Sequence, residues 1–200
     1  CLGIGGSRLG PEFIYEFQSN NEPINVHFCS SFDLLELKDV LRRCKQSETY
    51  IFVSSKSFKT TEILKNLDFV KSWFSEVPNL KFYDHFYGVS SDPDEMTLHN
   101  IDKANQFEIL ESLGGRFSLW SSMSLPAFVN SDFNCYLDLL EGAELADEHT
   151  ITSPWEVNIP VVMALLSVWN RNALKINNHA IFSYNHRLRS LAKYISQVSM

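Results

Sequence analysis

The chain has 200 residues, of which 44% are apolar and 20% charged, and its 17 basic and 24 acidic residues give a net charge of −7. This composition is typical of a globular protein and excludes a disordered or low-complexity chain. The negative charge argues against a nucleic-acid partner or an anionic membrane surface, because both would repel it. Any anion that the chain binds must therefore meet a local cluster of positive groups.

The longest apolar stretch covers residues 159–169. It is too short to span a bilayer, which requires about 20 residues. The cysteines show neither a C-x-x-C pair nor a metal-ligand spacing; they are Cys1, Cys29, Cys44 and Cys135. We expect reduced, mostly buried thiols in a cytoplasmic protein.

Short apolar runs alternate with helical patterns as far as residue 110. The predicted strands cover residues 2–4, 24–28, 50–53, 81–89 and 107–110. The predicted helices cover residues 11–18, with Pro11 at the first helical position, 33–43 and 60–76. This alternation predicts an α/β fold with a parallel sheet covered by helices on both faces.

The pattern changes near residue 125. Helices are predicted over residues 133–147, 159–169 and 185–197, and a strand over 178–182. Residues 159–169 are apolar on all sides, which indicates a helix buried on every side.

The first candidate site is the turn GIGGSRLGP, which begins at Gly3. A glycine-rich turn between a strand and a helix lets the backbone approach a ligand closely. It lacks the dinucleotide fingerprint, because Arg8 stands where the third glycine should fall, and it lacks the lysine of a P-loop. A tight turn without a ligand is the alternative.

The second candidate site is SSKSFKTTE, residues 54–62, between a predicted strand and a helix. Its hydroxyls and its two lysines suit a phosphate, which carries a charge of about −1.5 to −2 and three acceptor oxygens. The carboxyl end of a strand in an open α/β sheet is also where ligands bind. The alternative is a helix cap with solvated serines.

The third candidate site is ESLGGRFSLWSS, residues 111–122. Two glycines allow a sharp turn that presents Arg116 among small hydroxyls, where a guanidinium could stabilise an oxyanion. The alternative is an arginine paired with a structural carboxylate. The six histidines are scattered, and none is a candidate on spacing alone.

Taken in order, these three segments resemble the glucose-6-phosphate isomerase family, and the similarity continues through NIPVVMALLSVWNRN to Met200. The resemblance implies a pair of sugar-isomerase (SIS) domains, each a three-layer α/β/α sandwich, in a cytoplasmic homodimer. It implies residues 1–125 as the first such domain and residues 126–200 as a helical segment and the start of the second. It implies sugar phosphates as the ligands, namely glucose 6-phosphate and fructose 6-phosphate, and neither a metal nor an organic cofactor.

The same resemblance assigns roles to individual residues. The sugar would be lined by Gly6 and Ser7, and the phosphate held by Ser55, Lys56, Ser57 and Thr60. The enediolate would be stabilised by Arg116, and the reacting centre touched by Gln197. The family usually has threonine where this chain has Ser57, and either residue supplies a hydroxyl.

In the family, the glutamate that moves the proton between C1 and C2 follows the segment that matches residues 196–200. We therefore expect this chain to be an internal piece of a longer isomerase, inactive by itself. Two alternatives stay open: a separate SIS-type module that senses a sugar phosphate, and a purely structural α/β domain.

Overall fold

The computed structural model describes residues 1–18, 23–31 and 33–199. They form two compact units, one of Cys1–Ser131 with Ser183–Met200 and the other of Asp132–Phe182. Among the described helices, none is both long and apolar enough to cross a membrane.

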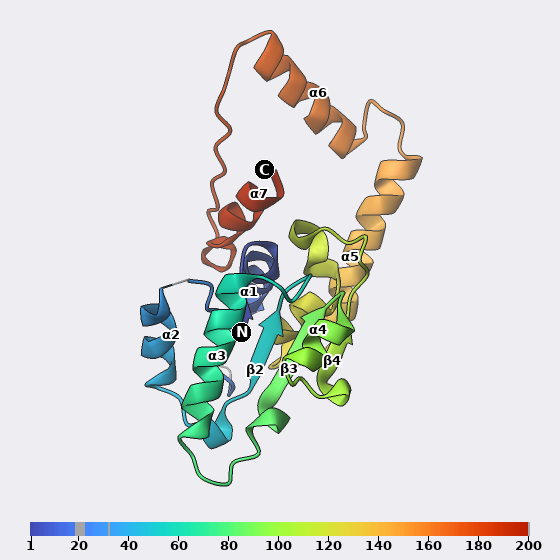
Figure 1. Ribbon diagram of the computed structural model, residues 1–200. Helices are drawn as coiled ribbons and strands as arrows, with labels where there is room; N and C mark the ends of the chain where they lie inside the picture. Colours follow the sequence, from blue (N-terminus) through green and yellow to red (C-terminus); the bar gives the residue numbers. More distant parts are fainter. Residues whose placement is uncertain (19–22, 32, 200) are drawn as a thin grey trace. The chain divides into compact units, whose positions relative to one another are not determined.

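The first unit is built on a four-stranded sheet, in which every pair of neighbouring strands is parallel (Figure 1). The strands, in spatial order, are β1 (Leu2–Gly3), β2 (Ile51–Ser54), β3 (Phe86–Ser90) and β4 (Gln106–Glu108). The α-helices of this unit are α1 (Gly6–Gln18), α2 (Leu34–Leu41), α3 (Thr61–Ser75), α4 (Pro93–Leu98) and α7 (Leu191–Ser199). The 3₁₀ helices are η1 (Gln46–Glu48), η2 (Phe82–His85), η3 (Lys103–Asn105), η4 (Gly115–Trp120), η5 (Ser122–Phe128) and η6 (His186–Leu188). This architecture confirms the predicted α/β class with a parallel sheet.

Both faces of the sheet carry apolar clusters. On one face, Val53 of β2 and Phe86 of β3 pack in a core with the buried stripe of α3, which is Ile63, Leu67, Val70 and Phe74. Those four residues recur at helical spacing, so α3 turns one apolar side to the sheet. A second cluster joins Val89 of β3 to Ile109 and to Met123 of η5. Burying each such side chain stabilises the fold by about 1.5–3 kcal/mol relative to exposure.

One predicted strand is absent and another is shorter than expected. Residues 24–28 form no strand, although Cys29 makes an isolated parallel bridge to Leu2 and its N–H donates to the Cys1 carbonyl at 2.8 Å. The run 81–89 begins as η2 and becomes a strand only at Phe86, which is the residue in register with Ile51 at the start of β2. The physical reason is the same in both cases: a strand extends only as far as its neighbour offers backbone groups.

The prediction that Pro11 opens the first helix is wrong, because α1 begins at Gly6. The backbone turns at Gly5, whose φ of +59° lies in the left-handed region that favours glycine. The Leu9 N–H then donates to the Gly5 carbonyl at 2.9 Å. The helix can therefore start directly after β1, and Pro11 lies inside it.

The second unit contains α5 (Phe133–Thr152) and α6 (Ile159–Asn172). The prediction that residues 159–169 are buried on every side is wrong for this chain: Leu165 and Trp169 are 54% and 60% exposed. Within residues 132–182, α6 has only α5 as a helical neighbour, so most of its apolar surface has nothing to pack against. The predicted strand at 178–182 is also wrong, since no described strand of this unit lies beside it to pair with its backbone.

Candidate functional site

The loops that follow β1, β2 and β3 begin at one edge of the sheet. Gly3 is in register with Ser54, and Ser54 with Val89, so the carboxyl ends of these strands are level. This edge is where open parallel sheets bind ligands. The first two predicted motifs both start there.

The turn after β1 brings three predicted residues together. A Cβ placed on Gly6 would lie 2.1 Å from the Gly115 carbonyl oxygen and 2.6 Å from the Arg116 nitrogen, so these backbones touch directly. A Cβ on Gly5 would lie 3.4 Å from Nε2 of Gln197. Gly6, Arg116 and Gln197 therefore meet at this turn, although they are far apart in the sequence. Ser7 follows in α1 and is buried.

The loop after β2 is anchored to the end of β3 through Lys56. The Lys56 carbonyl accepts hydrogen bonds from the Ser90 hydroxyl at 2.7 Å, from the Ser91 hydroxyl at 2.9 Å and from the Ser91 N–H at 2.9 Å. Across the loop, the hydroxyls of Ser55 and Thr60 are 3.3 Å apart. These bonds hold the loop while the Ser57 side chain stays exposed.

The two lysines of this loop differ in their partners. The Lys59 ammonium is 2.9 Å from an Asp92 oxygen and 3.3 Å from a Glu95 oxygen. The hydrogen bond from Lys59 lowers the pKa of the Asp92 carboxyl, and Asp92 in turn raises the pKa of Lys59. Among the described residues, Lys56 has no carboxylate within ion-pair distance. Lys56 is therefore the ammonium group that is available to an anion.

Arg116 is also free of a structural carboxylate. Its guanidinium lies 5.9 Å from the centre of the Phe117 ring, and no described carboxylate forms an ion pair with it. The alternative reading of a structurally paired arginine is therefore wrong for the described chain. By contrast, Arg8 of the same glycine-rich motif is paired with Glu12 at 2.9 Å and belongs to the structure.

Sequence reasoning missed three residues that shape this site. The serines at the end of β3, Ser90 and Ser91, anchor the Lys56 carbonyl, but nothing in their local sequence indicates that contact. Phe58 lies fully buried within the loop, with a φ of +53°. The sequence offers one indication of this burial: Phe58 is an aromatic residue between two hydrophilic ones, Ser57 and Lys59. A single aromatic side chain in a polar loop can fix that loop to the core.

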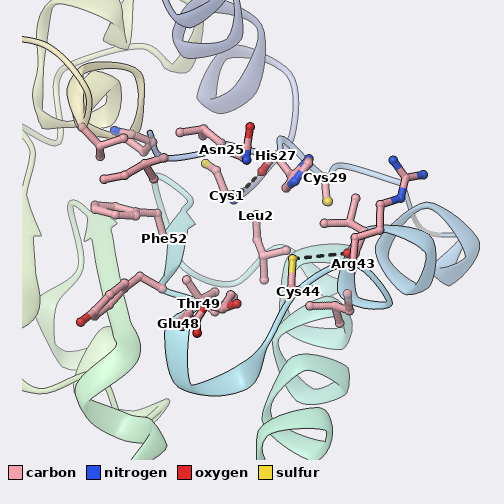
Figure 2. A pocket seen from close by; sticks show the side chains of 18 of the residues that line it. Cys1, Leu2, Asn25, His27, Cys29, Arg43, Cys44, Glu48, Thr49 and Phe52 are labelled. Atoms are coloured by element: carbon pink, nitrogen blue, oxygen red, sulfur yellow. Dashed lines mark hydrogen bonds between the residues drawn. The ribbon is translucent and has the colours of Figure 1, made fainter. Parts of the chain in front are cut away.

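A cavity of about 690 Å³ lies elsewhere, at the amino-terminal ends of β1 and β2 (Figure 2). Leu2, Cys44 and Phe52 line it together with other mainly apolar side chains. Burial raises the pKa of the Cys29 thiol on its wall. Since the predicted motifs lie at the carboxyl ends of these strands, the cavity is not part of the candidate site.

The arrangement at the carboxyl edge has a defined chemistry. It combines serine and threonine hydroxyls, a tight glycine turn, and the Lys56 ammonium and Arg116 guanidinium, neither of which forms an ion pair with a described carboxylate. Within the described ranges, no three His, Cys, Asp or Glu side chains are grouped so as to hold a metal ion. The fold and the site together define a parallel α/β protein that gathers hydroxyl and cationic groups at the carboxyl ends of its strands.

Comparison with known proteins gives the family. The profile of phosphoglucose isomerase matches residues 1–200, so the chain belongs to the phosphoglucose isomerase family. It is 39% identical over 203 residues to a glucose-6-phosphate isomerase of Hydrogenovibrio crunogenus and 38% identical over 209 residues to one of Acinetobacter baumannii. Each alignment covers 100% of this chain and 37% of the relative, so the chain spans little more than a third of these proteins.

Solved structures of similar proteins have the same fold as this chain. A glucose-6-phosphate isomerase from Chlamydia trachomatis superposes with a TM-score of 0.89 at 30% identity, over 98% of this chain and 38% of that one. A hypothetical protein from Thermus thermophilus superposes with a TM-score of 0.85 at 27% identity, over 98% of this chain and 46% of that one.

Proposed function

We propose that this chain forms the substrate-holding part of an enzyme that interconverts glucose 6-phosphate and fructose 6-phosphate. The observation that carries the proposal is that Lys56 and Arg116, in two motifs of a chain that belongs to the phosphoglucose isomerase family, form no ion pair with any described carboxylate. A sugar phosphate has one strongly anionic end and one carbonyl end, which develops negative charge when the adjacent C–H is deprotonated.

Each end of the substrate has its own set of groups in the proposal. The phosphate is held by Ser55, Lys56, Ser57 and Thr60, and the sugar is lined by Gly6 and Ser7. Arg116 stabilises the enediolate oxygen, and Gln197 contacts the reacting end. Positioning of this kind contributes up to about 7–11 kcal/mol to lowering a barrier. Loss of one oxyanion donor typically costs about 3–4 kcal/mol.

Proton transfer between C1 and C2 needs a carboxylate base beside the bound sugar. None of the described carboxylates forms an ion pair with Arg116 or Lys56, and Glu12 and Glu16 of α1 already pair with Arg8 and Arg189. We propose that the base lies outside these segments, as the family resemblance implies. The homodimer, the cytoplasmic location and the division into SIS domains at residue 125 stay predictions.

Replacing Lys56 tests the phosphate site. We expect Lys56→Ala to weaken binding of 6-phosphogluconate and of inorganic phosphate about tenfold or more, because a charge-assisted hydrogen bond contributes about 1.5–3 kcal/mol. The measurement is isothermal titration calorimetry on the 200-residue chain. Lys59→Ala is the matched control, since Lys59 is already engaged by Asp92, and it should change affinity by less than about twofold. Equal losses in both variants, or none in either, would contradict the proposed site.

With the base placed outside residues 1–200, we expect the 200-residue chain to bind the substrate without converting it. Fructose 6-phosphate incubated with the purified chain should give no glucose 6-phosphate above the buffer rate, as followed by NMR. Turnover that disappears in Arg116→Gln would show that a carboxylate within this chain acts as the base.

A further inference from the structure

Helix α7 packs on α1 through one aromatic residue, Tyr194. Its ring stacks on Phe13 of α1, with ring centres 6.1 Å apart and planes 7° from parallel. Gly10 makes room for this ring, because a Cβ there would lie 3.3 Å from Cε2 of Tyr194. The start of α7 is further tied to α1 by Arg189, whose Nε is 3.1 Å from a Glu16 oxygen.

The phenol of Tyr194 reaches the predicted oxyanion-binding segment. Its hydroxyl donates to the Arg116 carbonyl at 3.5 Å. A tyrosine phenol is protonated at neutral pH and can therefore donate, and burial raises the pKa of this phenol further. Gly6 of α1 lies directly against the Gly115 carbonyl. The backbone at Gly115 and Arg116 is therefore contacted by both α1 and α7, while the Arg116 guanidinium has no ion-pair partner among the described residues.

The same helix places a second predicted site residue. Gln197 follows Tyr194 by three positions, so both lie on one side of α7. Its side-chain amide rests against Gly5. Tyr194 therefore contacts the Arg116 segment directly and shares one face of α7 with Gln197.

We propose that Tyr194 is a positioning residue that sets Arg116 and Gln197 relative to each other at the carbonyl end of the substrate. The inference rests on the proposed function, since it assigns Tyr194 a role in the same site. It differs from a packing role in one respect: the hydroxyl, and not the ring alone, is needed.

The test compares Tyr194→Phe, which keeps the ring stack and removes the hydroxyl, with Tyr194→Leu, which removes both. In the 200-residue chain, Tyr194→Phe should weaken binding of 6-phosphogluconate about twofold, as expected for a long neutral hydrogen bond that contributes about 0.5 kcal/mol. Binding of inorganic phosphate should stay unchanged, because the loop of residues 55–60 does not depend on Tyr194. Tyr194→Leu should weaken 6-phosphogluconate binding further. Tyr184→Phe is the matched control, since Tyr184 is 97% exposed.

Hydrogen exchange gives a readout that needs no ligand. In Tyr194→Phe, backbone amides of residues 114–121 should exchange faster, while those of α2 keep the wild-type rate. Unchanged affinity together with unchanged exchange would overturn the inference, and so would equal losses for 6-phosphogluconate and phosphate. If the wild-type chain binds neither ligand, the proposed function fails, and exchange at residues 114–121 alone decides whether Tyr194 holds the Arg116 segment.

Discussion

Gly6→Ala is expected to remove sugar-phosphate binding and to lower the free energy of unfolding by about 3 kcal/mol or more. Overpacking usually costs about 1–3 kcal/mol, and this contact is tighter than most. The added Cβ would lie 2.1 Å from the Gly115 carbonyl oxygen and 2.3 Å from the carbonyl carbon. Because these are backbone atoms, no side chain can rotate away. Either α1 or the Gly115–Arg116 segment must move, and Arg116 then leaves its place.

The matched control for this prediction is the other glycine of the same contact. A Cβ on Gly115 would meet nothing within 4 Å, so Gly115→Ala should keep near-wild-type stability and binding. Denaturant unfolding followed by circular dichroism and titration with 6-phosphogluconate measure both effects. Equal behaviour of the two variants would show that the close approach of Gly6 is not required.

Phe58→Ala is expected to lower the free energy of unfolding by about 3–5 kcal/mol, the usual cost of removing a buried aromatic side chain. Phe58 is 0% exposed and belongs to the main core, although it sits in the middle of the hydrophilic loop after β2. Its φ of +53° is unfavourable for phenylalanine, so its burial offsets a strained backbone. Without the ring, the loop loses its anchor, and phosphate affinity should fall together with stability.

An exposed phenylalanine gives the control for this change. Phe133 is 65% exposed, and Phe133→Ala should alter stability by no more than about 0.5 kcal/mol. Phosphate affinity is measured under conditions in which Phe58→Ala is still folded. A folded Phe58→Ala variant with wild-type phosphate affinity would mean that the loop holds its shape through the Lys56 carbonyl bonds alone.

Gly6→Ala and Phe58→Ala separate the carbonyl end of the proposed site from its phosphate end. Gly6 acts on the carbonyl end through Arg116, whereas Phe58 acts on the phosphate end through the 55–60 loop. Titration with inorganic phosphate alone should therefore detect a loss in Phe58→Ala and a much smaller one in a folded Gly6→Ala variant.

Most of the candidate site could be found in the sequence because its polar groups are clustered along the chain. Hydroxyls and lysines crowd into residues 54–62, and two glycines precede Arg116. The same reasoning could not separate Lys56 from Lys59, since the ion pair that occupies Lys59 comes from Asp92 and Glu95 of the next loop and helix. Nor could it find the Ser90 and Ser91 bonds to Lys56, which cross from one strand end to another.

By itself, the amino-acid sequence determined the class of fold, the order of the main helices and strands, and the segments proposed to carry the chemistry. It could do so because hydrophobic periodicity and turn residues act within a few positions of each other. Only the tertiary structure decided where strands end, that α6 stays exposed, and that Gly6, Arg116 and Gln197 meet at one turn. Those features depend on which backbone groups and surfaces come together across long stretches of chain, and local sequence does not contain that information.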